Sequence, residues 1–356
     1  MRIIIAGGGT GGHVFPAISI AEEISQRNHK DEILFVGTQK GMENELVQKN
    51  GYQIRHISSR GFVGRGIMKT FAAFFSAFKG LLESVSIIRN YKPDVVLGVG
   101  GYVSGPFLLA SFLVRKPTAI CEQNTVPGVT NRILGKIVDK IFVSYDSSIQ
   151  YFPSNKVLVT GNPIRKNILQ TYEITRYSDS ISILIFGGSQ GAKSLNRAVP
   201  EAVSRIVHEN ISIVHQTGKN DFDYVKNSYN ENGVDAEVIE FIDDMSGAYA
   251  IADLVIGRAG AGTIAEITAL GKPSILVPFP YAAHNHQYEN AKILDEEGAC
   301  ALIEDKVATP ENIARTLTNL LDRDKLNVMS SNAKRLGHPE ASKKIVDELY
   351  KLAGDK

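Results

Sequence analysis

Residues 1–17 read MRIIIAGGGTGGHVFPA, a short isoleucine run that leads directly into a glycine cluster and then His13. A β-branched run of this length is typical of a buried strand, and glycine lets the following backbone approach an anion closely. Gly7, Gly9 and Gly12 match the dinucleotide-binding pattern G-x-G-x-x-G. The stretch therefore predicts the first strand, loop and helix of a Rossmann-like sheet.

The glycine pattern lacks the partner that a dinucleotide requires. A carboxylate at the end of the second strand binds the ribose hydroxyls in dinucleotide folds. Here the second strand-like run, EILFVG, is followed by Thr38, and Glu43 lies further into the next element. We therefore expect the loop to hold a phosphate ligand other than NAD, and we expect no cofactor.

The strand–glycine–helix pattern restarts at residues 180–196, SISILIFGGSQGAKSLN. Continuous apolar strands separated by helices predict parallel sheets covered on both faces. We predict an α/β chain of two Rossmann-like parallel-sheet domains, residues 1–161 and 162–339, facing across a cleft. A helix at 340–356 could pack on either domain. The expected strands are residues 2–6, 32–36, 52–57, 93–99, 117–121, 139–144, 156–160, 181–187, 211–216, 236–241, 252–257, 272–278 and 299–303.

Composition and charge narrow the class of protein. The chain is 43% hydrophobic and 22% charged, and its two cysteines are typical of a protein in a reducing compartment. Residues 1–161 carry 18 Lys and Arg against 11 Asp and Glu, a charge of +7, whereas the remainder carries −6. A basic half favours an anionic partner such as phosphate or a membrane surface. The basic residues are scattered without an aromatic platform, so we expect no nucleic-acid partner.

Residues 95–114 form a stretch of 20 residues without a charge, nominally long enough to span a bilayer. The sequence GVGGYVSGP in its middle interrupts any continuous helix. We predict a buried strand, a glycine turn and a short helix starting near Pro106 instead.

The sequence GRAGAGTIAE at residues 257–266 predicts a helix starting near Gly262, with its free N–H groups available to a diphosphate. Glu266 follows one turn later, where its carboxylate could accept hydrogen bonds from two ribose hydroxyls. The alternative is a capping box in which Thr263 caps the helix and Glu266 answers it. Arg258 and the glycines on either side of Ala261 favour ligand binding.

Eight motifs, GGGTGGHVFPA, GGYVSGP, EQNTVPGVTN, GNPIR, GGSQGAKSLN, EFIDDM, RAGAGTIAE and HNHQYENA, occur in the order found in the MurG family. The chain resembles this family of bacterial glycosyltransferases over essentially its full length. The resemblance implies a GT-B fold and a role in peptidoglycan synthesis. It also implies inverting transfer of N-acetylglucosamine from UDP-N-acetylglucosamine to undecaprenyl-diphospho-N-acetylmuramoyl-pentapeptide (lipid I to lipid II). The implied location is the cytoplasmic face of the cell membrane, as a peripheral protein.

By this resemblance, Thr10, Gly11 and Gly12 face the donor sugar, with the acceptor diphosphate close by. His13 is then a candidate catalytic base for the acceptor hydroxyl, since an imidazole titrates in the right range. The start of the helix would lower its pKa and keep it neutral. The alternative is a histidine that only caps or packs against the helix.

Glu122 and Asn124 of EQNTVPGVTN follow a predicted strand at the functional edge of the sheet. Asn124 resembles the family's donor-sugar contact. Glu122 is a rival base, because a buried carboxylate with a raised pKa could take up the proton; the alternative is a structural ion pair. Tyr102 of GGYVSGP is a candidate contact to the acceptor or the donor sugar.

The second domain supplies most of the donor contacts that the resemblance implies. Ile242 would present backbone groups to uracil, Glu266 would bind the ribose, and Gln287 would contact the sugar. Arg258 would support the loop or the diphosphate. The resemblance also implies donor contacts at five further residues, which are Arg165, Ser189, Ala261, Gly262 and Thr263.

Two clusters could suggest a metal, and we predict none at either. His284, His286 and Glu289 lack a further ligand at a recognisable spacing. The sequence DFD at residues 221–223 has the D-x-D form of metal-dependent transferases, but we expect it to begin a surface helix.

Residues 61–85, GFVGRGIMKTFAAFFSAFKGLLESV, are the candidate membrane contact. Apolar residues recur there at helical spacing beside cations, as suits an anionic lipid surface. The alternative is an ordinary core-facing helix. The candidate lipid-facing residues are Ile67, Phe71, Phe74, Phe75 and Phe78.

Two other functions fit the same pattern. A UDP-N-acetylglucosamine epimerase would use a similar double-Rossmann cleft but would need no lipid and no basic patch. A non-catalytic scaffold that binds a UDP-sugar at the membrane would need neither His13 nor Glu122 for turnover.

Overall fold

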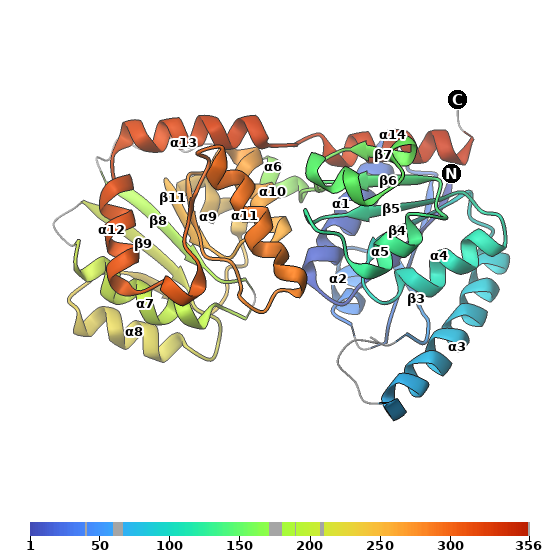
Figure 1. Cartoon of the computed structure of the whole chain (residues 1–356), viewed down its shortest axis with the longest axis horizontal. Coiled ribbons are helices and arrows are strands. Elements are labelled where there is room, and N and C mark those ends of the chain that lie inside the picture. Colours follow the sequence, from blue (N-terminus) through green and yellow to red (C-terminus); the bar gives the residue numbers. More distant parts are fainter. Residues whose placement is uncertain (40, 60–66, 171–179, 189, 207–209, 355–356) are drawn as a thin grey trace. The chain divides into compact units, whose positions relative to one another are not determined.

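The computed structural model describes residues 1–39, 41–59, 67–170, 180–188, 190–206 and 210–354, and the side chains of residues 67–77 lie outside the described part. The chain divides into two compact units (Figure 1). The first unit combines Met1–Arg165 with Pro339–Lys356, and the second is Lys166–His338. Each unit has its own sheet and its own hydrophobic core.

The described residues of the first unit form a seven-stranded sheet of order β3-β2-β1-β4-β5-β6-β7. Every neighbouring pair of strands in it is parallel. The strands are β1 (Arg2–Gly7), β2 (Glu32–Gly37), β3 (Gln53–His56), β4 (Val95–Gly100), β5 (Thr118–Glu122), β6 (Lys140–Val143) and β7 (Val157–Val159).

The central strand β1 is buried on both faces. Ile3 and Ile5 belong to one core cluster, whereas Ile4 and Ala6 belong to the other. Because successive side chains of a strand point to opposite faces, two separate layers of helices must cover this sheet. Because both faces of β1 are buried, its sequence is a continuous apolar run.

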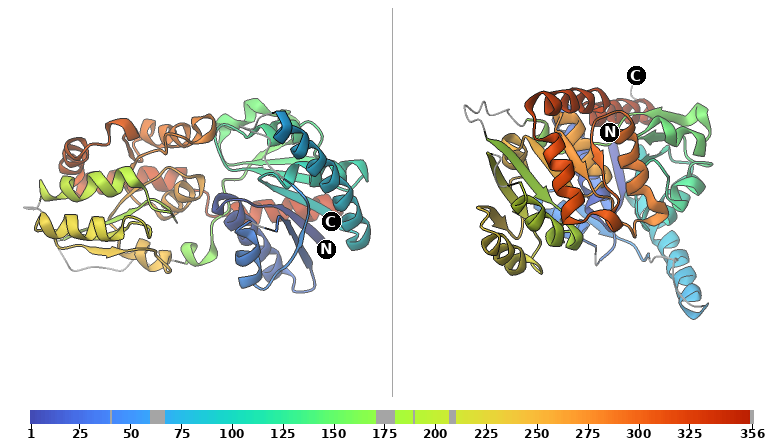
Figure 2. Two further views of the ribbon diagram at one scale, coloured as in Figure 1. Left: turned by 90° about the horizontal axis from the view of Figure 1, so that it is seen from below. Right: turned by 60° about the vertical axis from the view of Figure 1, so that its left-hand side comes forward.

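Helices form these two layers, as the views in Figure 2 also show. Helices α1 (Gly11–Arg27), α2 (Glu43–Lys49) and α14 (Ala341–Ala353) supply side chains to the cluster around Ile3. Helices α3 (Ile67–Tyr91), α4 (Ser104–Leu113) and α5 (Val129–Leu134) supply the cluster around Ile4.

The C-terminal helix α14 belongs to the first unit. Ile345, Val346 and Leu349 are buried in the same cluster as residues of α1. At its surface, Lys140 Nζ lies 3.1 Å from Glu348 Oε2. Apolar burial therefore returns the end of the chain to the unit in which it began.

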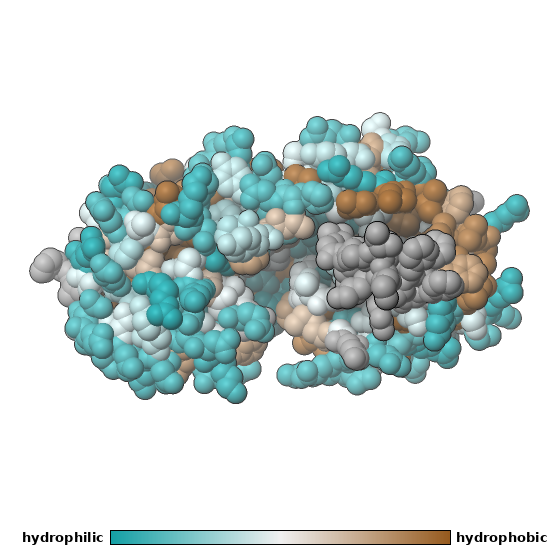
Figure 3. Space-filling model, turned by 60° about the horizontal axis from the view of Figure 1, so that its bottom comes forward, coloured by the Kyte–Doolittle hydropathy of each residue, from teal (hydrophilic) through white to brown (hydrophobic). Residues whose placement is uncertain are grey.

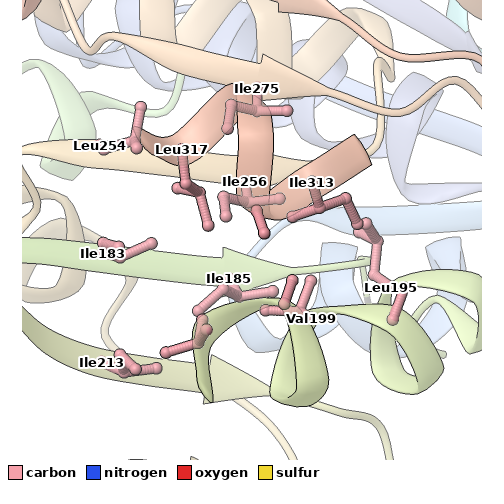
Figure 4. Close-up of a cluster of buried hydrophobic side chains, with 14 of the residues drawn as sticks. Ile183, Ile185, Leu195, Val199, Ile213, Leu254, Ile256, Ile275, Ile313 and Leu317 are labelled. Carbon is pink, nitrogen blue, oxygen red and sulfur yellow. The ribbon is translucent and has the colours of Figure 1, made fainter. Parts of the chain in front are cut away.

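The second unit repeats the design with a sheet of order β10-β9-β8-β11-β12-β13, again parallel throughout its described strands. Ile185 and Ile256 on neighbouring strands pack against Val199 of α7 (Lys193–Ser204) and Leu317 of α12 (Pro310–Leu320) (Figure 4). The strands are β8 (Ile181–Phe186), β9 (Ile211–Gln216), β10 (Glu237–Ile239), β11 (Leu254–Gly257), β12 (Ser274–Leu276) and β13 (Ala301–Leu302).

Eight helices of the second unit lie within the described residues. The short α6 (Lys166–Leu169) opens the unit. The others are α7 (Lys193–Ser204), α8 (Phe222–Glu231), α9 (Met245–Ile251), α10 (Ala261–Leu270), α11 (His286–Glu296), α12 (Pro310–Leu320) and α13 (Arg323–Leu336).

The structure confirms the main expectations about the fold. Each expected strand forms, and the uncharged stretch at 95–114 becomes strand β4, a glycine turn and helix α4. Among the described residues, no helix has the length and apolar character needed to cross a bilayer. The sequence DFD does begin a helix, since Asp221 is the N-cap of α8.

The capping box expected as one alternative in α10 is wrong. Gly260 is the N-cap of this helix, so Thr263 already lies inside the first turn. Glu266 is consequently too far along the helix to reach the N-cap backbone, and its side chain is available for another partner.

The core of the second unit also contains a fully buried histidine. His215 Nδ1 lies 3.0 Å from Tyr229 Oη, and His215 Nε2 lies 3.2 Å from Asn196 Oδ1. Burial lowers the pKa of His215 from 6.5 to about 3. The folded chain therefore keeps this imidazole neutral at a pH where the unfolded chain would protonate it.

We expect this histidine to make the protein acid-sensitive. The pKa of His215 is lower in the folded chain than in the unfolded chain. The neutral imidazole therefore costs the folded state nothing above pH 6.5, and the free energy of unfolding falls as the pH drops from 6.5 toward 3. The loss approaches about 1.4 kcal/mol per pH unit for one proton. We would measure the free energy of unfolding by urea at several pH values in this range. Its dependence on pH should be shallower in His215→Gln and unchanged in the exposed control His29→Gln. Equal slopes in both variants would contradict the assignment.

Candidate functional site

In the first unit, three predicted motifs meet at one edge of the sheet. Strands β1, β4 and β5 are neighbours, and GGGTGGH, GGYVS and EQNT follow their carboxyl ends. Ligands of parallel sheets bind at this edge. The sheet therefore gathers segments about a hundred residues apart in the chain into one half-site.

The first glycine loop leaves backbone exposed at the start of α1. Gly9 has φ +98°, a conformation that favours glycine, and Thr10 is the N-cap of the helix. Thr10 and Gly12 are exposed, and Gly11 is partly exposed. The first turn of a 17-residue helix can attract an anion with its N–H groups and its dipole.

His13 packs against the second glycine turn. It is the third residue of α1, and a Cβ on Gly100 would lie 2.6 Å from His13 Nδ1. Gly100 has φ +106°, so both its conformation and its contact with the imidazole require glycine. Gly100 N donates a hydrogen bond of 3.1 Å to Ser104 Oγ, and Ser104 Oγ donates one of 2.9 Å to Ala6 O. These bonds tie the turn to the end of β1.

Tyr102 lies in the same turn and 57% of it is exposed. Its carbonyl accepts a hydrogen bond of 2.7 Å from Ser59 Oγ. The backbone is therefore held while the phenol remains accessible, as a ligand contact requires.

Glu122 is the buried centre of the third motif, with 3% of its surface exposed. Its carboxylate accepts hydrogen bonds from Asn124 N (3.1 Å), Asn124 Nδ2 (3.3 Å), Gly128 N (3.2 Å) and Asn131 Nδ2 (2.8 Å). Burial raises the pKa of Glu122, and the hydrogen bonds, led by that from Asn131, oppose the shift. Amide groups are therefore its hydrogen-bond partners, and Glu122 takes part in no ion pair among the described residues.

The loop around Asn124 is held from a second side. Ser148 Oγ lies within hydrogen-bond distance of Asn124 O (3.0 Å) and Thr125 O (3.1 Å). Ser104, Asn131 and Ser148 were not predicted from the sequence, because a serine or asparagine that supports a loop has no local signature.

In the second unit, the glycine loop after β8 precedes helix α7. Gly188 and Gly191 have φ +85° and +73°, and Ser189 between them lies outside the described residues. Asn196 of α7 donates from Nδ2 to Thr217 O at 2.8 Å, and 1% of Asn196 is exposed. Asn196 thus supports the loop that follows β9.

Helix α10 presents a second helix start, which is partly exposed. Among the described residues, no atom outside the helix backbone and the neighbouring residues lies within 4 Å of a Cβ placed on Gly262, so these residues leave open space beside the first turn, next to Ala261. Tyr249 Oη donates to Glu266 Oε2 at 3.0 Å, and Tyr249 is itself fully buried. A buried phenol thus orients the carboxylate, and this partner was not predicted from the sequence.

Arg258 holds loops together at the end of β11. Its Nη1 donates to Val277 O (3.0 Å), Pro278 O (3.1 Å) and Asp305 Oδ1 (2.6 Å), and Nη2 donates to Ser194 Oγ (2.9 Å). The side chains of Arg258 and Asp305 are 12% and 21% exposed. These contacts favour the supporting role over a direct contact with diphosphate.

Three other predicted residues also make contacts that fix their surroundings. Gln287 Oε1 accepts a hydrogen bond of 2.9 Å from Phe279 N, and the side chain of Ile242 is buried at 9% exposure. Arg165 was expected in the second domain, but it is the last residue of the first unit, with its guanidinium 4.8 Å from the ring centroid of Phe15.

No group of three or more histidine, cysteine, aspartate or glutamate side chains arranged to hold a metal ion occurs among the described residues. His284 and Asn285 adopt left-handed backbone angles before α11, and His286 Nδ1 lies 2.7 Å from Ala283 O. The histidines of this loop thus take part in its local turn.

Comparison with known proteins agrees with this geometry. The models of the glycosyltransferase family 28 N-terminal and C-terminal domains match residues 3–143 and 182–345. A Myxococcus xanthus protein is 44% identical over 99% of this chain and 93% of its own length. It is named UDP-N-acetylglucosamine–N-acetylmuramyl-(pentapeptide) pyrophosphoryl-undecaprenol N-acetylglucosamine transferase.

Solved structures show the same relationship. The crystal structure of Acinetobacter baumannii MurG matches with a TM-score of 0.83 and 32% identity, over 98% of this chain and 99% of that one. A UDP-GlcNAc 2-epimerase from Neisseria meningitidis matches with a TM-score of 0.69 at 16% identity, over 99% of this chain and 100% of that one. This second likeness extends to the fold alone. The chain has the GT-B architecture and belongs to the MurG family of N-acetylglucosaminyltransferases, within glycosyltransferase family 28.

Proposed function

We propose that this chain transfers N-acetylglucosamine from UDP-N-acetylglucosamine to undecaprenyl-diphospho-N-acetylmuramoyl-pentapeptide, with inversion at the anomeric carbon. The observation that carries the proposal is the 44% identity, over nearly the whole of both chains, to a relative whose name states this donor and acceptor. The two half-sites supply the chemistry that both substrates require.

The second unit is the proposed donor site. The start of α10, at Ala261, Gly262 and Thr263, receives the diphosphate, and Glu266 accepts hydrogen bonds from the ribose. The N–H groups and dipole of this helix stabilise the negative charge of the leaving UDP, so the proposal requires no metal ion. Further proposed donor contacts are Ile242 to uracil and Arg165, Ser189 and Gln287 to the phosphates or sugar. Arg258 is proposed to support the loops around this site.

The first unit is the proposed acceptor site. The exposed start of α1, at Thr10, Gly11 and Gly12, is proposed to face the donor sugar, with the acceptor diphosphate close by. Asn124 is a proposed contact to the donor sugar, and the accessible phenol of Tyr102 is a proposed contact to the acceptor or the donor sugar.

In the reaction, the bond between the anomeric carbon and the UDP oxygen breaks, and its electron pair leaves on UDP. The acceptor 4-hydroxyl oxygen bonds to that carbon and gives its proton to a base. His13 is the proposed base, because Glu122 is enclosed by amide donors that already engage its carboxylate. Glu122 is then the residue that holds the Asn124 loop in place.

Exposed apolar side chains on the first unit support peripheral binding to the cytoplasmic face of a membrane. They project from the described part of α3 and from α4 and α5, which pack side by side, and Figure 3 shows apolar side chains gathered over this unit. Phe78 is 56% exposed; the side chains of Ile67, Phe71, Phe74 and Phe75 lie outside the described residues. The apolar surface consists of Phe78, Leu82, Leu109, Phe112, Leu113, Val129 and Ile133, near Lys79, Arg115, Lys116 and Arg132.

The first test is transfer of radiolabelled N-acetylglucosamine from its UDP donor to a lipid I analogue, with a chelator present. We expect a labelled disaccharide-lipid product. Binding of the donor without transfer by folded protein would favour the scaffold, and interconversion of the UDP-sugar would favour the epimerase. Loss of activity with the chelator would contradict the metal-independent mechanism.

His13→Gln should lower kcat by about 10²–10⁴-fold, the usual contribution of a general base, with little change in KM for the UDP donor. Steady-state kinetics of this variant are compared with His29→Gln, an exposed histidine just beyond α1. A near-normal kcat in His13→Gln, together with a large loss in Glu122→Gln, would assign the base to Glu122.

Membrane binding is tested with the double variant Phe78→Ser and Leu82→Ser. Each removes an exposed side chain worth up to about 1.5–3 kcal/mol on burial, so co-sedimentation with vesicles containing phosphatidylglycerol should fall at least about tenfold. UDP binding should not change. Val328→Ser, which changes a similarly exposed apolar residue of α13, is the control. Equal vesicle binding by the double variant and by this control would contradict the assignment of the surface.

A further inference from the structure

Glu43 is the first residue of α2, and its side chain turns inward to the first glycine loop. Only 2% of it is exposed. Its Oε2 accepts a hydrogen bond from Gly9 N at 3.0 Å, and its Oε1 accepts from Thr38 N at 2.8 Å and from Thr38 Oγ1 at 3.0 Å. One carboxylate therefore joins the loop after β1 to the end of β2.

The surrounding backbone is shaped to admit this carboxylate. A Cβ on Gly8 would lie 2.5 Å from Glu43 Oε1, and a Cβ on Gly37 would lie 2.6 Å from Glu43 Cγ. A Cβ on Gly41 would overlap the same carboxylate. Three glycines, one after β1 and two between the end of β2 and the start of α2, thus leave room for a single side chain.

The next residue strengthens the same junction. Asn44 donates from Nδ2 to Thr38 O (2.9 Å) and Gln39 O (2.7 Å). Thr38 is therefore bound through its backbone N–H and hydroxyl by Glu43 and through its carbonyl by Asn44. The helix start of α2 acts as a clamp on the end of β2.

The carboxylate is held in its charged form. Burial acts to raise the pKa of Glu43, but the hydrogen bonds from Gly9 and Thr38 together outweigh it, and the pKa lies below its ordinary value. A fixed anion consequently takes up the Gly9 N–H. In a dinucleotide fold, the acidic residue at this end of the sheet binds ribose and leaves the glycine loop to the pyrophosphate.

We propose that Glu43 is a positioning residue that fixes the first glycine loop from within, so that the start of α1 at Gly11 and Gly12 faces the anionic part of the lipid-linked acceptor. This inference rests on the proposed function. The same placement disfavours a dinucleotide at this G-x-G-x-x-G loop, because the acidic residue and one of the loop's N–H groups are already paired with each other.

The inference is tested with Glu43→Gln in the full-length protein. An amide keeps the size of the side chain but turns an NH₂ group toward an N–H donor, so the loop loses its charged acceptor. We expect KM for a lipid I analogue to rise about tenfold or more, while KM for UDP-N-acetylglucosamine stays within about twofold. Glu45→Gln, an exposed glutamate of the same helix, is the matched control.

Two further variants separate positioning from loss of fold. Thr38→Val removes only the hydroxyl donor and should raise the acceptor KM about threefold or more. Gly41→Ala should act by displacing the carboxylate, so its effect and that of Glu43→Gln should not add in the double variant. Thermal unfolding establishes that each variant is folded.

Hydrogen exchange of the Gly9 amide provides a readout that needs no substrate. We expect faster exchange in Glu43→Gln than in Glu45→Gln. The inference is overturned if folded Glu43→Gln matches its control in both acceptor KM and Gly9 exchange. It is equally overturned if Glu43→Gln fails to fold and Thr38→Val leaves both quantities unchanged. Absence of transfer by the unmodified protein would instead reject the proposed function, while Gly9 exchange would still report on the loop.

Discussion

The parallel pairing of the strands is the constraint on which the other features depend. Parallel strands deliver the chain to the same edge of a sheet each time, and helices must return it to the opposite edge. In the first unit this brings together the segments after β1, β4 and β5, which are central neighbours in the sheet. Loops that are distant in sequence can thus share one ligand.

The loops at these edges are held by buried polar side chains that do not themselves need to face a substrate. Glu122 collects amide donors from the segment that follows β5, and Glu43 does the same for the first glycine loop. In the second unit, Arg258 links three segments and Tyr249 orients Glu266. Leaving such groups unpaired would cost free energy, so each network specifies one loop conformation.

The same architecture does not dictate one reaction. The fold is shared with UDP-sugar epimerases at low sequence identity, so the chemistry must come from the side chains placed on it. The first unit combines an exposed helix start, an imidazole beside a glycine turn and exposed apolar helices. This combination suits a charged acceptor on a lipid. A protein that binds only a soluble UDP-sugar would not require it.

The sequence by itself determined the strands, the two sheets, the glycine loops and the family. These follow from local patterns, because continuous apolar runs report burial on both faces and glycine clusters report close approach of the backbone. Only the tertiary structure decided the partners of the polar side chains. Glu43 contacts Gly9, 34 residues away, and α14 packs on α1 from the other end of the chain. Such contacts leave no periodic signal, since they depend on where the sheet places each segment and on which buried group still needs a partner.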